Sequence, residues 1–180
     1  ANGTARNQVN TAISLSKVRA VIRYLQAQRA KPVTKMLSGS TNFATRPVEG
    51  GYIALCHTDC SADIRNLAGF TPTAEYGSRT VLCPEELGSV ENVRFIASPL
   101  LAPILAAGSG TLNGMKSVGA SVVDIYPVVF IGEDAYGHVA LKGAGAVTPS
   151  VINPDQKTKD DPLGQRGYVG WKTYYSCVRR

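Results

Sequence analysis

The stretch D-I-Y-P-V-V-F-I-G-E-D-A-Y-G-H-V-A-L-K-G (Asp124–Gly143) holds the clearest strand signal in the sequence. Its residues 125–131 form a short apolar run rich in Val and Ile, which predicts a strand buried on both faces. Pro127 has no N–H to donate, so this strand is expected at a sheet edge or at a bulge. A turn bounded by glycines, 132–137, and a second strand, 138–141, complete a predicted β-hairpin.

A longer amphipathic helix is predicted near the N-terminus, from Ser14 or Ser16 to Ala30. Its apolar residues recur at the i, i+3, i+7 spacing of one buried face, and serine is a favourable N-cap. Lys31 precedes a proline and is pushed out of the helical region, which should end the helix. The opposite side of the helix carries four cations. They are Lys17, Arg19, Arg23 and Arg29.

Length and composition favour a single loop-rich α+β domain over residues 1–180. The chain is 44% hydrophobic, enough for a core, and its 18 glycines and 10 prolines indicate many turns. Val93, Phe95 and Ala97 alternate with Arg94 and Ile96, which predicts a half-buried strand over 93–97. Further strands are expected at 52–57 and 168–178, and helical turns at 59–69 and 83–87. Loops are expected at 37–51, 70–77, 108–120 and 143–167, and a loop or a distorted helix at 100–107.

Charge is distributed unevenly along the chain. No Asp or Glu precedes Glu49, whereas eight Lys and Arg residues do, so the opening stretch has a charge of +8. The remainder holds 11 basic and 13 acidic residues, a net of −2. Such asymmetry indicates contact with nucleic acid or charge complementarity between neighbouring copies. No apolar segment approaches the length of a membrane span, so no membrane partner is expected.

The cluster Cys56–Cys60, C-H-T-D-C, contains residue types that bind zinc. A zinc site also needs a second ligand pair at matching spacing, and the other cysteines and the other histidine are isolated. Cys56 and His57 are adjacent on a predicted strand, so their side chains point to opposite faces and cannot easily share a proton. We therefore expect a strand end leading into a turn, with no metal and no cofactor. A Cys/His metal-dependent hydrolase is the least favoured hypothesis.

The basic helix also permits a second hypothesis, a small basic nucleic-acid-binding module. Its cations can bind phosphates in a sequence-independent and salt-sensitive way. Tyr24 is the only aromatic residue between them, so stacking on single strands is not favoured. This hypothesis predicts an affinity for duplex DNA that falls steeply with salt.

Several blocks of sequence, in order along nearly the whole chain, resemble one family. The resemblance is to the major capsid proteins of tailed bacteriophages of the type first described in podoviruses with a large virion polymerase, which have the Hong Kong 97-like capsid fold. The blocks are A-K-P (Ala30–Pro32), Y-I-A-L-C-H-T-D (Tyr52–Asp59), D-I-R-N-L-A-G-F (Asp63–Phe70), S-V-E-N-V-R-F-I (Ser89–Ile96), the stretch Asp124–Gly143, and D-P-L-G-Q-R-G-Y-V-G-W-K-T-Y-Y (Asp161–Tyr175).

The resemblance implies an α+β capsid domain, mostly the axial domain with part of the peripheral domain. It implies a structural protein without catalysis, located in the virion and made in the bacterial cytoplasm. Copies would assemble into pentamers and hexamers of an icosahedral shell that encloses double-stranded DNA, contacted non-specifically, with a scaffolding or decoration protein as a further partner.

Two more expectations concern the chain ends and the surface between subunits. The N-terminal arm, extended loop and spine helix of the family have no counterpart here, so an internal or C-terminal fragment is expected. The basic face of the first helix, with its four cations, is the expected inter-subunit surface. The glycine-rich segment 108–120 would be an axial loop near the centre of a capsomer.

Overall fold

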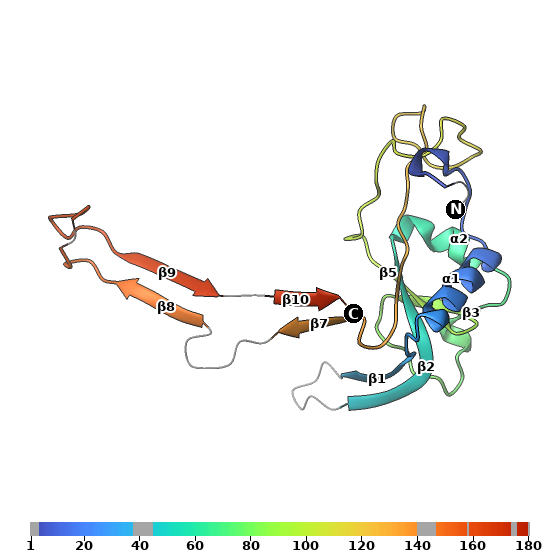
Figure 1. Ribbon diagram of the computed structural model, residues 1–180, viewed down its shortest axis with the longest axis horizontal. Coiled ribbons are helices and arrows are strands. Elements are labelled where there is room, and N and C mark those ends of the chain that lie inside the picture. Colours follow the sequence, from blue (N-terminus) through green and yellow to red (C-terminus); the bar gives the residue numbers. More distant parts are fainter. Residues whose placement is uncertain (1–3, 38–44, 140–146, 158, 174–175, 180) are drawn as a thin grey trace. The chain divides into compact units, whose positions relative to one another are not determined.

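The computed structural model of the chain describes residues 4–37, 45–139, 147–157, 159–173 and 176–179 (Figure 1). Contacts between residues divide the chain into two units, Ala1–Glu133 and Asp134–Arg180. The fold class is α+β, with many strands and few helices, as the sequence predicts. That the two units act as one capsid-type domain over 1–180 stays a prediction.

The first unit is built on a six-stranded sheet with the order β1-β2-β5-β4-β3, in which β6 also pairs with β2. Only the pair β2 and β5 is parallel. Because β5 and β6 both pair with the second half of β2, they lie on its two opposite sides. The strands are β1 (Val33–Leu37), β2 (Thr45–Cys56), β3 (Phe70–Pro72), β4 (Glu86–Val90), β5 (Val93–Ala97) and β6 (Val129–Ile131).

The long helix α1 (Leu15–Ala27) confirms the predicted N-terminal helix, although it ends earlier than expected. Arg29 takes the left-handed conformation with φ 59°, and the Ala30 N–H donates to the Leu25 carbonyl at 2.9 Å. This is the Schellman arrangement that satisfies the last carbonyls of a helix. The helix therefore stops before the expected Lys31-Pro32 signal. The other helical segments are α2 (Ser61–Arg65) and the 3₁₀ turns η1 (Arg6–Gln8), η2 (Thr58–Cys60) and η3 (Thr73–Glu75).

The core lies between the two α-helices and the sheet of the first unit. Val18 and Ile22 of α1 are buried there, as the helical period predicts. The Tyr52 hydroxyl donates to the Ala30 carbonyl at 2.9 Å, which fastens the end of α1 to β2. The buried core residues are Val18, Ile22, Tyr52, Ala54, Cys56, Ile64, Leu67, Val90, Val93, Phe95 and Ala97.

The predicted β-hairpin of the stretch Asp124–Gly143 is wrong. Its first strand is reduced to β6, which pairs with β2, and β7 (Tyr136–Val139) pairs with β10 (Ser176–Arg179). The backbone of Ile125 bonds to Ile104 instead, and this pairing leaves the apolar run irregular before residue 129. The edge position predicted from Pro127 is confirmed, but β6 is only partly buried, not buried on both faces.

Other expected loops and turns also differ. The segments expected as loops contain β3, β8 (Val147–Ile152) and the first part of β2, residues 45–51. The helical turn expected at 83–87 is shortened to one hydrogen-bonded turn, in which the Glu86 N–H donates to the Cys83 carbonyl at 3.1 Å, because Glu86 already begins β4 and pairs with Ile96 of β5. Arg94, expected on an exposed face, is buried, because the segment that leads into β4 covers that face of the sheet. Its Nη1 donates to the Thr80 carbonyl at 2.7 Å.

The second unit contains two separate two-stranded sheets. β7 pairs with β10, and β8 pairs with β9 (Tyr168–Thr173), so the single last strand expected at 168–178 is two strands. The described residues of β7, β9 and β10 are all exposed. The buried core cluster draws on the first unit alone, so within the described residues these sheets have no hydrophobic core of their own.

Candidate functional site

The four cations predicted as a basic face are all exposed, but they do different things. Arg19 donates from Nε and Nη2 to a single oxygen, Oε1 of Glu91, at 2.7 and 2.5 Å. The hydrogen bond and the charge of Glu91 raise the pKa of Arg19. Arg19 is thus paired within its own chain and is not free for a partner.

The remaining three cations lie in different local settings, and that they form one inter-subunit face stays a prediction. Arg29 occupies the left-handed position that ends α1. Lys17 lines a groove beside the helix. Arg23 is exposed and has no ion pair among the residues that the structure describes. Of the four cations, Lys17, Arg23 and Arg29 have no ion pair among the described residues and stay open to a partner.

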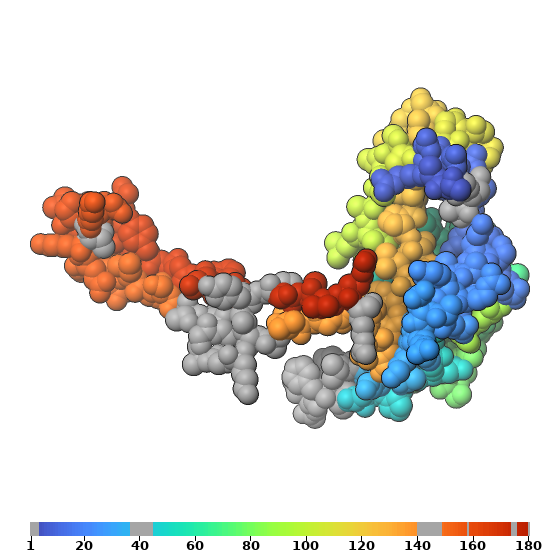
Figure 2. Space-filling model, viewed as in Figure 1, coloured from blue at the N-terminus to red at the C-terminus, as the bar shows by residue number. Residues whose placement is uncertain are grey.

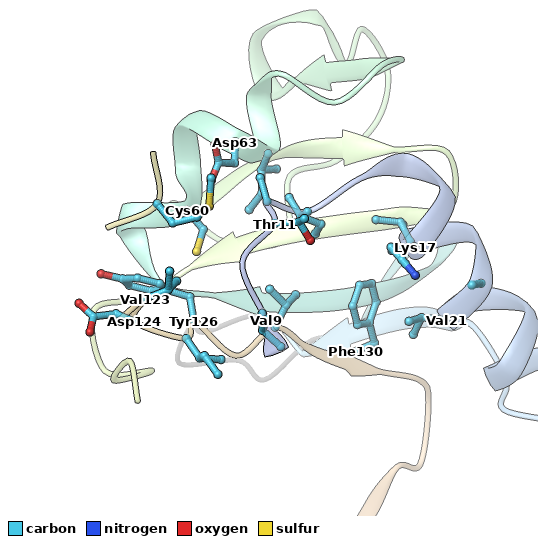
Figure 3. A pocket seen from close by; sticks show the side chains of 18 of the residues that line it. Val9, Thr11, Lys17, Val21, Cys60, Asp63, Val123, Asp124, Tyr126 and Phe130 are labelled. Atoms are coloured by element: carbon cyan, nitrogen blue, oxygen red, sulfur yellow. The ribbon is translucent and has the colours of Figure 1, made fainter. Parts of the chain in front are cut away.

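An apolar groove of about 530 Å³ lies beside α1 in the first unit and is called here the α1 groove. One wall is α1 with the segment before it, and the other is the segment 123–130, which lies beside the helix in Figure 2. In Figure 3, Lys17, Val21 and Phe130 lie at one end of the groove, and Cys60, Asp63 and Tyr126 lie at the other. Its apolar lining includes Val9, Ile13, Val21, Ile125, Val128 and Phe130.

Asp124 fixes the second wall of the α1 groove. Its carboxylate is buried and accepts two backbone N–H groups, from Ala106 at 2.8 Å and from Val118 at 2.9 Å. The Asp124 N–H donates to the Lys116 carbonyl at 3.0 Å. The Asp124 side chain thus joins the backbone at Ala106 to the backbone at Val118, two positions in the irregular segment before β6. In the sequence, the feature that marks this role is a single acidic residue between Val123 and Ile125.

A polar cluster around Asp59 ties the glycine-rich segment to η2. Oδ2 of Asp59 accepts from Lys116 Nζ at 2.5 Å and from the Tyr126 hydroxyl at 2.8 Å, and the Asp59 N–H donates to His57 Nδ1 at 3.1 Å. The hydrogen bond from Lys116, then that from Tyr126, lowers the pKa of Asp59, and Asp59 raises the pKa of Lys116. Both groups are stabilised in their charged forms, the opposite of what a general base or an amine nucleophile requires.

Cys56 and Cys60 lack the reactive thiolates that the Cys/His hydrolase hypothesis requires. Burial raises the pKa of the Cys56 thiol to about 11, and burial with the nearby carboxylates raises that of Cys60 to about 11. The thiolate is the form that attacks substrates, so both side chains are poor nucleophiles at neutral pH. Within the described ranges, no group of three His, Cys, Asp or Glu side chains can hold a metal ion.

A second exposed apolar surface lies on the sheet of β8 and β9, called here the β8–β9 ribbon. Val151 pairs with Val169 and Pro149 pairs with Trp171, and residues directly opposite in an antiparallel pair share a face. Val169 and Trp171 are 77% and 71% exposed. Residues opposite or two apart along a strand point the same way, so these four side chains form one apolar stripe.

Comparison with models of known protein families and with curated proteins finds no match to this chain. In the part of the chain that the structure describes, every helix is too short or too polar to cross a membrane.

Proposed function

We propose that this chain is a structural protein of a bacteriophage capsid, with the Hong Kong 97-like fold and without a catalytic role. In this proposal, residues 1–180 supply most of an axial domain and part of a peripheral domain. Copies of the chain assemble into pentamers and hexamers of an icosahedral shell in the virion. The shell encloses double-stranded DNA, contacted without sequence preference, and a scaffolding or decoration protein is a further partner.

The observation that carries this proposal is the apolar stripe of the β8–β9 ribbon. A two-stranded sheet alone in water is marginally stable, and an exposed apolar patch marks an interaction surface. Trp171 and Val169 are largely exposed, and the described part of the second unit has no core to cover them. A closed symmetric shell offers identical neighbours that can cover such a stripe in every copy.

Sedimentation tests the proposal. A gently prepared lysate of the source material is treated with DNase and run through a density gradient, and the chain is detected in the fractions by mass spectrometry. We expect it to migrate with particles of virion size. Migration at the size of a small protein, or release from large particles by DNase, contradicts the capsid proposal.

One observation keeps the nucleic-acid-binding module as a second candidate. Lys17 and Arg23 are exposed on α1, and no ion pair to either is present among the described residues. Two phosphate contacts give a slope of about −2 when log affinity is plotted against log salt. Binding of the isolated chain to duplex DNA with that slope, lost in Lys17→Gln and Arg23→Gln variants, favours this candidate.

A further inference from the structure

The chain has two exposed apolar surfaces of different shape. One is the α1 groove in the first unit, and the other is the apolar stripe of the β8–β9 ribbon in the second. The groove is concave and bounded by α1 and residues 123–130 (Figure 3). The stripe is a row of side chains on a two-stranded sheet. We propose that the β8–β9 ribbon of one copy packs into the α1 groove of a second copy. This inference rests on the proposed function and names the partner of that surface.

The groove suits an apolar occupant. Val21, Val128 and Phe130 are only partly buried by the chain itself, so a ligand in the groove can cover them further. A volume of about 530 Å³ falls within the range of clefts that take several side chains or a small molecule. Ala20 and Tyr24 stand exposed at its edge, and Tyr24 is 65% exposed.

The ribbon suits an apolar groove. On the face that carries Val151, Val169 and Trp171, the alternation of the two strands places no charged residue, because Lys172 points to the opposite face. Trp171 is the only tryptophan of the chain. A large aromatic side chain surrounded by smaller apolar ones is the usual anchor of an interface, since aromatic residues supply most binding free energy when fully buried.

The area argues for an extended assembly and against an isolated dimer. Burying a tryptophan removes about 150–250 Å² of surface, and two valines add less, so one contact is well below the about 800 Å² per partner of a stable interface. Each copy, however, offers one ribbon and one groove and can therefore make two contacts. Because the two surfaces differ, the contact is head to tail, and its repetition forms a ring where the rotation between copies closes.

Two variants separate the halves of this contact. Ala20→Glu places a charge in the groove at an exposed helical position and keeps Trp171. Trp171→Ser removes the anchor of the ribbon and leaves the groove intact. Far-UV circular dichroism checks that each variant folds. Tyr24→Ser, at another exposed position of the groove, is a second groove variant in case Ala20→Glu does not fold.

Mixing these variants gives a specific result. The ribbon of Ala20→Glu can enter the groove of Trp171→Ser, and the complex then stops at two chains because each partner lacks the other surface. We expect the Trp171 emission of Ala20→Glu to shift to shorter wavelength only when Trp171→Ser is added, and sedimentation to give a 1:1 complex. Ala27 is also an exposed alanine of α1 but does not line the groove, so Ala27→Glu should behave as the unaltered chain.

Either of two results overturns the inference. One is an unchanged Trp171 emission after mixing at any concentration. The other is a short-wavelength emission of Ala20→Glu alone that does not change on dilution, which means that the ribbon is covered within its own chain. If the chain still sediments with virion-sized particles, the capsid function stands and only the ribbon contact falls. If it also stays at small-protein size, both proposals fall.

Discussion

Arg19 of α1 donates two hydrogen bonds to one carboxylate oxygen of Glu91, which lies in the two-residue turn between β4 and β5. Glu91 has φ 51°, a left-handed conformation that side chains other than glycine adopt at some cost. The first helix and a turn of the sheet, 72 residues apart, are thus joined by an ion pair on the surface. A cation that the sequence offers to a partner is already bound within the chain.

Because of this ion pair, reversing the charge of Arg19 and reversing that of Arg23 should have different effects on stability, although the sequence predicts the same role for both residues. Arg23→Glu should weaken assembly and leave the fold unchanged, because Arg23 is exposed and unpaired within the described residues. Arg19→Glu sets two carboxylates against each other and should also lower thermal stability. The double variant Arg19→Glu with Glu91→Arg should restore the stability. Thermal unfolding and gradient sedimentation of the three variants check this, and normal assembly of Arg23→Glu contradicts an inter-subunit role for the basic face.

Gly88 should be among the least tolerant positions of the sheet. It has φ 157° beside a register shift between β4 and β5, and a Cβ atom there overlaps the Thr71 carbonyl and comes within 2.5 Å of the Phe70 ring. Gly88→Ala should reduce the free energy of unfolding by about 2–3 kcal/mol, because a packed backbone must move. Gly119→Ala, with nothing within 4 Å, is the matched control. Urea unfolding measures both, and equal stabilities contradict the overlap.

Asp124→Asn should loosen the wall of the α1 groove. The amide offers one acceptor oxygen where the carboxylate offers two, so the N–H of Ala106 or of Val118 loses its partner, at a cost of about 1–3 kcal/mol. Hydrogen exchange of these two amides should accelerate. Asp63→Asn, an exposed carboxylate that lines the same groove, should leave both rates unchanged. Slow exchange at both amides in Asp124→Asn argues against this anchoring role.

The cluster around Asp59 should respond to acid. Its pKa is lowered in the folded state, so the stabilisation is present above the unfolded value of about 3.9 and is lost as the pH falls through the folded pKa. Lys116→Gln removes the first cause of the shift, and the titration midpoint of the Asp59 carboxyl, followed by NMR, should rise toward the ordinary value. Lys17→Gln serves as the control. An unchanged midpoint in Lys116→Gln means that this hydrogen bond does not form in solution.

Thiol reactivity tests the interpretation of the cysteines. Cys177 is exposed, whereas Cys56 and Cys60 carry thiols whose pKa values are raised to about 11. Iodoacetamide at neutral pH should therefore label Cys177 first and Cys56 last, because alkylation requires the thiolate. Peptide mass spectrometry identifies the labelled sites. Rapid labelling of Cys60 contradicts the raised pKa and revives a reactive role for this cluster.

Local sequence patterns predicted elements that depend on local interactions. The helical period gave α1 with Val18 and Ile22 on its buried face, and the Val93–Ala97 strand was predicted with the bounds that β5 has. Strand partners were predicted poorly, because pairing depends on distant residues: β6 pairs with β2 rather than β7. The burial of Arg94 was missed for the same reason, since Thr80 and the residues around it cover that strand only in three dimensions.

The candidate site was predicted least well. Lys17 was identified as a cation but not as part of a groove, because the opposite wall comes from residues 123–130, more than 100 positions away. The anchoring role of Asp124 was not predicted. Its two backbone contacts are 6 and 18 positions away in an irregular segment, where no periodic pattern points to them.

The position of β6 at the edge of β2 also sets an order of events during synthesis. Leu55 of β2 pairs with Val129, so about 70 further residues must be made before this edge of the sheet is covered. At about 5–20 residues per second, that edge and the apolar side of α1 stay open for several seconds on the ribosome. Residues 123–130, the second wall of the α1 groove, are among the last of the first unit to be made. The apolar residues of α1 that line the groove are therefore exposed to solvent until these residues leave the ribosome.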